Sequence, residues 1–266
     1  MLTTLRELAE AETKNFELST GALGPSIGIL NAFEKAYGSL PPLVSLPEGG
    51  LESDETMAVY AVLHELAFCR RQLTMSVLTL LRAYQGDAML HLRRAIEACA
   101  FAVRMNKHHE VVRAWLSASD DDAAYERYRG AFRTKDLFPN ANHPDHDPVL
   151  TELKSHYDQC SKLMHGSIFG MGGHFEYPDS SGVSFQVKFF DLAPDHSLIV
   201  VLYLILASHR QFLQLFGNML RPYNGEAMDH WMTELKPVQL MLDVYREDWK
   251  RHIPNPVGVR NDAASL

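Results

Sequence analysis

The sequence predicts a mostly α-helical protein, a multi-helix bundle with one inserted β-hairpin. Apolar residues recur at helical spacing along most of the chain, and only at residues 174–190 does the apolar period change to two. Short breaks rich in proline and glycine, such as the SLPPLVSLPEGG connector that begins at Ser39, separate the helical stretches. A chain of 266 residues with this pattern can bury a sizeable core.

The composition is that of a soluble globular protein, with 46% apolar and 22% charged residues. The formal net charge of −8 argues against indiscriminate binding to nucleic acids or anionic membranes but leaves room for a local basic patch. Three dispersed cysteines, Cys69, Cys99 and Cys160, argue against a disulfide framework and suit a reducing compartment. Because the N-terminal MLTTLRELAEAETK carries acids where a signal peptide has a basic region and an apolar core, we expect a cytoplasmic protein.

Residues 1–45 are predicted to form an N-terminal helical extension. An amphipathic helix over residues 2–20 is followed by a break and by a second, shorter helix that runs to about Tyr37. The main helical bundle is then expected to cover residues 46–251, and residues 252–266 are expected to be a flexible tail.

The longest helical pattern covers Thr56–Ala83. Gly86-Asp87 is typical of a helix stop followed by an N-cap, so the next helix, Ala88–Met105, is predicted to pack antiparallel on its predecessor. Cys69 and Cys99 would then lie at similar heights along the pair. A single long, kinked helix through this break is the alternative.

Three more helices are predicted in the middle of the chain, at Glu110–Leu116, from about residue 122 towards Phe132, and at Val149–His165. The hairpin is placed at residues 174–190, because the Pro-Asp-Ser-Ser-Gly turn there separates alternating apolar residues, Phe175, Tyr177, Val183, Phe185, Val187 and Phe189.

The most apolar helix is predicted at Leu198–Leu220, and a last helix at about Gly225–Arg251. In the helix predicted at Leu198–Leu220, the apolar run Leu198–Leu206 is too short to span a bilayer, and a longer span would include His209 and Arg210. We therefore expect a buried core helix and no membrane association.

The helix Ala88–Met105 carries three charged residues among apolar neighbours, Arg93, Arg94 and Glu97. Adjacent helical residues lie about 100° apart, so at most one of the two arginines can point squarely inward. Glu97 follows Arg93 by four residues and Arg94 by three, so either arginine can pair with it.

Tyr157, Ser161 and His165 follow at intervals of four on the helix Val149–His165 and share one broad face. An imidazole can act as a general acid or base near neutral pH, and a guanidinium binds phosphate in bidentate fashion.

A catalytic site is therefore predicted from Arg93, Arg94, Glu97, Ser161 and His165, with His165 within hydrogen-bonding or one-water reach of Glu97 or an arginine. The alternative is a structural polar network that ties two core helices together. No metal and no cofactor are predicted, because the dispersed histidines, His143, His146, His156, His165 and His174, lack a tight ligand spacing.

The run GDAMLHLRRAIEACAFAVRM, followed on a later helix by Tyr157, Ser161, His165 and Gly166, resembles a group of uncharacterised bacterial helical proteins. That group shows an Arg-x-x-x-Glu helix followed by a Tyr/Ser/His-Gly helix. It is similar in turn to the HEPN superfamily of helical-bundle proteins, many of which are RNases of toxin and antiphage systems. The resemblance covers about residues 55–220.

This resemblance implies a bacterial HEPN-like protein that acts as a metal-independent endoribonuclease or a defence component. The alternative, from a different class, is a non-catalytic ligand-binding or protein-interaction bundle with a structural Arg-Glu-His network. RNA or another anionic ligand at the local arginine cluster, and a second copy of the chain in a homodimer, are the partners left open.

Overall fold

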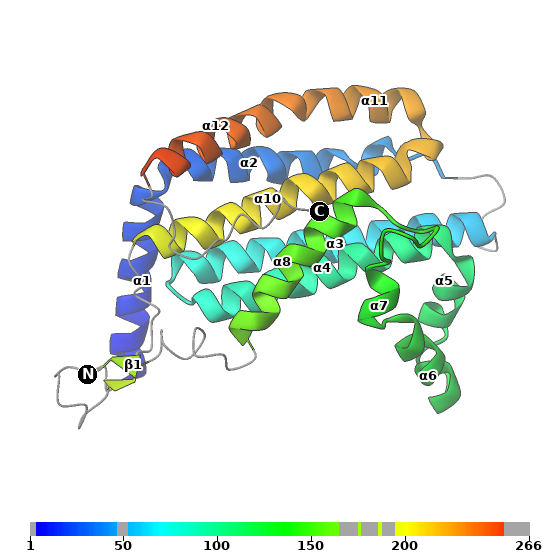
Figure 1. The fold of residues 1–266 in the computed structure, drawn as a ribbon, viewed down its shortest axis with the longest axis horizontal. Helices are drawn as coiled ribbons and strands as arrows, with labels where there is room; N and C mark the ends of the chain where they lie inside the picture. The colour runs from blue at the N-terminus through cyan, green and yellow to red at the C-terminus, as the bar shows by residue number, and fades with distance from the viewer. Residues whose placement is uncertain (1–3, 47–52, 165–174, 177–185, 188–194, 253–266) are drawn as a thin grey trace.

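The computed structural model describes residues 4–46, 53–164, 175–176, 186–187 and 195–252, which form a mostly helical bundle, as the sequence predicts (Figure 1). The α-helices are α1 (Leu5–Ala22), α2 (Gly24–Ser39), α3 (Asp54–Leu81), α4 (Gln85–Lys107), α5 (His109–Leu116), α6 (Asp122–Ala131), α7 (Thr134–Leu137), α8 (Pro148–Met164), α10 (Asp195–Leu220), α11 (Gly225–Glu234) and α12 (Lys236–His252). Two short 3-10 helices, η1 (Pro41–Leu43) and η3 (Arg221–Tyr223), follow α2 and α10.

Helix α10 lies at the centre of the bundle, as expected from its apolar sequence. It contacts α2, α3, α4 and α8 (Figure 1). Leu202, Ile205, Phe212 and Phe216 of this helix are completely buried. By length and composition alone, the segment Leu198–Tyr223 could cross a membrane, but 67% of its most apolar window is buried inside the bundle. This burial is that of a core helix.

Helices α3 and α4 form an antiparallel hairpin, which confirms the prediction and rules out one continuous helix through this region. The Cys69 thiol of α3 donates a hydrogen bond to the Ala95 carbonyl of α4, with a sulfur–oxygen distance of 3.3 Å. Burial raises the pKa of Cys69, and the neighbouring Cys99 raises it further. The two cysteines therefore lie at similar heights along the hairpin, as predicted.

The break between α3 and α4 lies at residues 82–84, so the predicted break at Gly86-Asp87 is wrong and Gly86 belongs to the first turn of α4. The chain turns where the Ala83 amide donates to the Leu80 carbonyl at 2.9 Å and the Tyr84 amide donates to the Thr79 carbonyl at 3.0 Å. This hydrogen-bond pair is a Schellman motif, which needs a left-handed residue. Ala83 takes that conformation, with φ of 68°.

Replacing Ala83 with glycine is expected to stabilise the protein by about 0.5–1 kcal/mol, because the left-handed conformation strains a residue that has a Cβ atom. Urea unfolding followed by circular dichroism measures the change. Ala67→Gly is the matched control: Ala67 is exposed in the middle of α3, and the same substitution there should destabilise by about 1 kcal/mol. Destabilisation by both variants would contradict the strain at Ala83.

Helix α11 packs closely against α10 at Gly217, where a Cβ atom would force its neighbours to shift. A Cβ atom built at Gly217 would lie 2.6 Å from Met232 Sδ and 3.0 Å from Trp231 Cζ3. The Trp231 indole also donates a hydrogen bond to Ser39 Oγ at 3.0 Å, which fixes its ring at the end of α2. Gly217 thus permits the close approach of the C-terminal helices to the core.

Gly217→Ala is therefore expected to lower the free energy of unfolding by about 1–2 kcal/mol, since Met232 can move aside but Trp231 cannot do so without losing its hydrogen bond. The measurement is the midpoint of urea unfolding. Gly86→Ala provides the control, because a Cβ atom there meets nothing within 4 Å and alanine should stabilise the helix. A Gly217→Ala protein as stable as Gly86→Ala would disprove the close approach.

The hairpin predicted at residues 174–190 is not supported. The described residues of this segment form two strands of two residues each, β1 (Phe175–Glu176) and β2 (Gln186–Val187). They pair antiparallel, with Phe175 opposite Val187. The other residues of the predicted hairpin lie outside the described part of the chain.

The two N-terminal helices differ in their burial. Helix α1 crosses one end of the bundle and has no buried residue (Figure 1). Helix α2 joins the core: Phe33 and Tyr37 are almost completely buried beside His209 of α10. The division into a 1–45 extension and a 46–251 bundle stays a prediction, and residues 252–266 lie outside the described residues except for His252, the last residue of α12.

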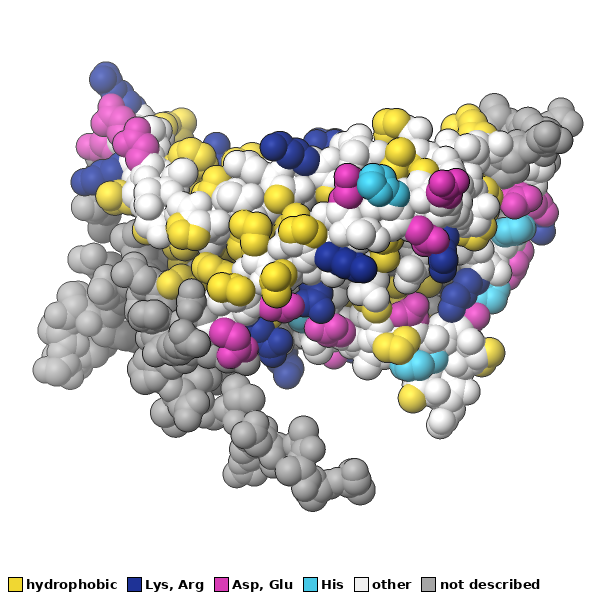
Figure 2. All heavy atoms as spheres, turned by 90° about the horizontal axis from the view of Figure 1, so that it is seen from above, with side chains coloured by type: hydrophobic (Ala, Val, Ile, Leu, Met, Phe, Trp, Pro, Cys, Tyr) yellow, Lys and Arg dark blue, Asp and Glu magenta, His cyan; other side chains and the backbone are white. Residues whose placement is uncertain are grey.

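The C-terminal helices cover the bundle on the face shown in Figure 2. Hydrophobic side chains gather on part of this face. Among the described side chains of α12, the large hydrophobic ones that remain exposed are Leu240, Met241 and Val244.

Candidate functional site

Arg93 of α4 forms a polar network with α8. Its Nε donates a hydrogen bond to Glu97 Oε1 at 3.1 Å, and its Nη2 donates to the Tyr157 hydroxyl at 3.0 Å. The guanidinium carbon also lies 4.9 Å from the centre of the Tyr157 ring. Tyr157 is buried and packs against Phe138 with a ring separation of 5.4 Å. The contact with Tyr157 joins α4 to α8. The ion pair between Arg93 and Glu97 lies within α4, as their spacing of four residues allowed.

Arg93 is a charged residue although most of its side chain is buried. The exposed fractions of the Arg93 and Glu97 side chains are 20% and 23%. Burial acts to lower the pKa of Arg93, but Glu97 and Tyr157 together raise it above its ordinary value. The guanidinium is thus a permanent cation whose described contacts are internal to the protein.

The other predicted site residues are placed differently. Arg94 is exposed and lines, together with Glu97, a cleft between α3, α4, α5 and α6. The Ser161 hydroxyl donates to the Tyr157 carbonyl of its own helix at 2.9 Å. His165 lies outside the described residues, so its predicted contact with Glu97 or the arginines does too. The structure brings together Arg93, Glu97 and Tyr157.

A cleft of about 390 Å³ opens between α3, α4, α5 and α6. We call it the aromatic cleft; its lining residues are His64, Glu65, Phe68, Gln72, Arg94, Glu97, Ala98, Phe101, Trp115, Tyr128 and Phe132. Its volume is within the range of small-molecule binding sites, and a few polar groups converge on apolar walls, as such sites require.

Aromatic rings form the walls of the cleft. Phe101 lies 4.9 Å from Phe132 and 6.0 Å, edge-on, from Tyr128, measured between ring centres. The rings of His64 and Trp115, which also line the cleft, are 5.1 Å apart. The aromatic residues come from helices α3, α4, α5 and α6, and Phe132 is the first residue after α6. Tertiary packing therefore brings them together.

Glu65 is a nearly buried carboxyl group in this cleft, with an exposed fraction of 7%. Its Oε1 lies 3.3 Å from His64 Nδ1. Burial raises the pKa of Glu65, and His64 opposes that shift. Tyr128 lines the same cleft, and the pKa of its hydroxyl is raised by burial and then by the charge of Glu65.

A hydrogen bond beside the cleft holds Gln72 in place. His91 Nδ1 and Gln72 Oε1 are 2.8 Å apart, so the imidazole donates from Nδ1 to the amide oxygen. Burial and the Arg94 charge both lower the pKa of His91, which favours the neutral ring.

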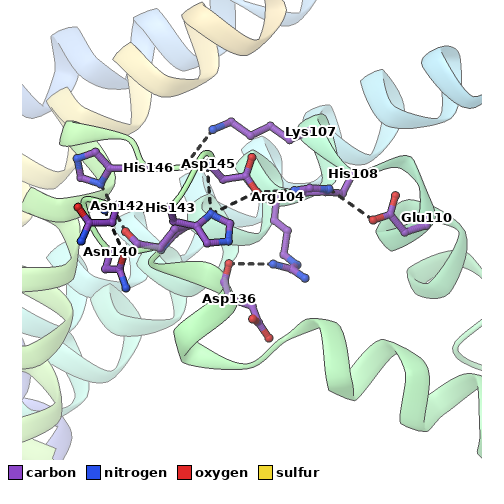
Figure 3. Close-up of polar contacts among 11 residues, drawn as sticks. Arg104, Lys107, His108, Glu110, Asp136, Asn140, Asn142, His143, Asp145 and His146 are labelled. Carbon is purple, nitrogen blue, oxygen red and sulfur yellow. Dashed lines mark hydrogen bonds and ion pairs between the residues drawn. The ribbon is translucent and has the colours of Figure 1, made fainter.

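A second polar cluster closes the loop after α7 onto α4 (Figure 3). His108 Nε2 lies 2.7 Å from Asp145 Oδ2, and this hydrogen bond is the main cause of the lowered pKa of Asp145. Lys107 Nζ donates to the Asp145 carbonyl at 2.9 Å, and the Asp145 amide donates to His143 Nδ1 at 3.1 Å. The space among these residues is only about 10 Å³, so the cluster fastens a loop and leaves no room for a ligand.

Sequence reasoning missed most of the aromatic cleft, including Glu65, Phe68 and Trp115. The available signal was a set of aromatic residues on the short helices α5 and α6, which have few buried residues of their own. Aromatic side chains on weakly buried helices need a partner surface. For α5 that surface is α3 and α4, and for the rings of α6 it is Phe101 of α4.

Comparison of the chain with protein-family models, curated proteins and solved structures found no match. The relation to the HEPN superfamily therefore stays a prediction from the sequence.

Proposed function

We propose that the protein is a non-catalytic, ligand-binding helical bundle whose ligand occupies the aromatic cleft. One observation carries the proposal: a cleft of about 390 Å³ combines aromatic walls with a nearly buried carboxyl group, Glu65, whose described partner is a single histidine. Buried carboxyl groups need hydrogen-bond donors or cations, and a bound ligand can supply them.

The contacts of Arg93 favour a binding protein over an enzyme. Its guanidinium donates to Glu97 and to Tyr157, so those donors are used within the fold. The Ser161 hydroxyl likewise donates to its own helix. In this proposal the network positions α4 and α8, while Arg94 and Glu97 contribute to the lining of the cleft.

The test is a thermal-shift screen of small cationic, neutral and anionic aromatic compounds. At least one class should raise the melting temperature of the wild type, and Phe68→Ala should remove the shift because it deletes one of the aromatic rings that line the cleft. Met75→Ala is the matched control: both residues lie on α3, with exposed fractions of 36% and 38%, but Met75 is outside the cleft. A shift that survives Phe68→Ala, or no shift with any class, would refute the proposal.

A metal-independent, HEPN-like endoribonuclease that acts in defence is the second candidate. The observation that favours it is the exposed Arg94 beside aromatic rings, because unpaired bases stack on such rings while arginine contacts phosphate. In this candidate His165 is the general acid or base, Ser161 and Glu97 assist it, and RNA is the partner.

If this second candidate is correct, purified protein should cleave single-stranded RNA in the presence of EDTA. His165→Ala should abolish cleavage and leave the melting temperature within a few degrees, whereas His230→Ala, at an exposed histidine of α11, should retain full activity. Absence of cleavage by the wild type, or equal activity of both variants, would exclude the candidate.

A further inference from the structure

We propose that the aromatic cleft selects a small organic cation, such as a substituted ammonium ion, held between the Glu65 carboxylate and the faces of the surrounding rings. This inference rests on the proposed ligand-binding function and names the class of ligand.

The charge of Glu65 is the first reason. Its carboxyl group is nearly buried, and its described partner, His64, has a side chain that is 58% exposed. The two groups are 3.3 Å apart, and water weakens an ion pair with so exposed a partner. The carboxylate therefore lacks a strong cation, and a cationic ligand would supply one.

The rings are the second reason. Aromatic faces carry negative charge density and attract cations, most strongly where water is excluded. Tyr128 and Glu65 line the same cleft. Trp115 also lines it, with its ring centre 5.1 Å from that of His64. A carboxylate among aromatic faces is the chemistry that recognises alkylated ammonium groups.

The position of Arg94 is the third reason. Arg94 lines the cleft together with Gln72, the hydrogen-bond partner of His91, and burial and the Arg94 charge lower the pKa of His91. The described ion pair of Glu65 is with His64 and not with Arg94. An anion bound beside Glu65 would therefore meet a carboxylate that has no guanidinium partner.

The test compares two probes of the same shape by isothermal titration calorimetry at pH 8. Choline carries a trimethylammonium group, and 3,3-dimethylbutan-1-ol has a neutral carbon in place of the nitrogen. Choline is expected to bind at least about tenfold more tightly, which corresponds to about 1.4 kcal/mol. Its affinity should fall as the pH falls through the pKa of Glu65, because the protonated carboxyl group has no charge to offer.

Amino-acid substitutions test whether Glu65 causes the preference for choline. Glu65→Gln should weaken choline binding about tenfold or more and leave the neutral alcohol unaffected. Glu55→Gln is the control, since it removes the same charge from an exposed position on α3 outside the cleft. Should Glu65→Gln fold poorly, Arg94→Gln offers an independent measurement, because removal of a repelling cation should tighten choline binding about twofold or more.

The outcomes separate the two proposals. If choline and the alcohol bind with equal affinity and Phe68→Ala abolishes the binding of both, the selection of a cation is overturned but a ligand-binding cleft is supported. Binding of uridine monophosphate that depends on Arg94 would also overturn it, since the ligand would then be an anion. No binding of any probe, together with no shift in the thermal screen, would overturn both.

Discussion

Replacing His209 with phenylalanine is expected to make the protein markedly more resistant to acid. His209 lies in the middle of α10, with 1% of its surface exposed, and its ring stacks on Phe33 at 5.3 Å with an interplanar angle of 2°. Within the described residues, neither ring nitrogen has a hydrogen-bond partner. Burial lowers the pKa of His209 from 6.5 to about 3, so the folded protein holds a neutral imidazole.

The sign of the pH effect follows from this shift. Between pH 6.5 and about pH 3 the unfolded chain takes up a proton at His209 that the folded chain refuses. Above pH 6.5 this residue therefore leaves the free energy of unfolding unchanged. Below pH 6.5 the free energy of unfolding falls, and at pH 5 the loss due to His209 is about 2 kcal/mol. His209→Phe removes the titrating group and keeps the stacked ring, so the variant should lose about 2 kcal/mol less between pH 8 and pH 5.

The measurement is urea unfolding of both proteins at several pH values. His209→Leu, which is closer to histidine in volume, should show the same reduced pH dependence even if the larger phenyl ring crowds the core. His230→Phe, on the exposed surface of α11, should leave the pH dependence of the wild type unchanged. Parallel pH profiles for wild type and His209→Phe would show that the buried imidazole does not titrate as expected.

The second large effect is expected from the two neighbouring arginines of α4. Arg93→Leu should lower the free energy of unfolding by about 2 kcal/mol, because it removes the contacts to Glu97 and Tyr157 and leaves a mostly buried carboxylate without its cation. Arg94→Leu should change stability by no more than about 0.5 kcal/mol, since the Arg94 side chain is exposed. Comparing the stabilities of Arg93→Leu and Arg94→Leu thus shows whether Arg93 has a structural role that its exposed neighbour lacks.

A double-mutant cycle between Arg93→Leu and Tyr157→Phe measures the link between α4 and α8 directly. The coupling energy should be about 1 kcal/mol, as for a hydrogen bond between a charged donor and a neutral acceptor. A coupling energy near zero, or an Arg94→Leu protein as unstable as Arg93→Leu, would show that Arg93 does not hold the helices together.

The helical hairpin of α3 and α4 could be predicted from the sequence because it depends on local periodicity and a short connection. The exact break could not, since an alanine, Ala83, occupies the left-handed position that glycine usually takes. The nearby Gly86 gave a false signal, and the carbonyls of Thr79 and Leu80 decide where α3 ends. Backbone hydrogen bonding at a helix end outweighs residue preference when the two disagree.

The candidate site was predictable only in part. A spacing of four residues was enough to expect the Arg93–Glu97 pair. Which arginine faces α8 depends on how α4 is rotated among its neighbours, and sequence spacing carries no information on that rotation. The aromatic cleft could not be predicted for a related reason: the packing of α3 on α4 brings Glu65 and Phe101 together, and only the tertiary position of α6 brings the Tyr128 ring within 6.0 Å of Phe101.

The central position of α10 has a consequence for synthesis of the protein. The ribosome makes α2, α3, α4 and α8 before it makes the helix against which all four pack. The α3–α4 hairpin can form early because its contacts are local. The apolar faces of these four helices that pack on α10 stay exposed to solvent until Leu220, the last residue of α10, has left the ribosome. Exposed apolar surface of this kind promotes aggregation. We therefore expect the nascent chain to depend on chaperones during elongation, and chains truncated before α10 to precipitate.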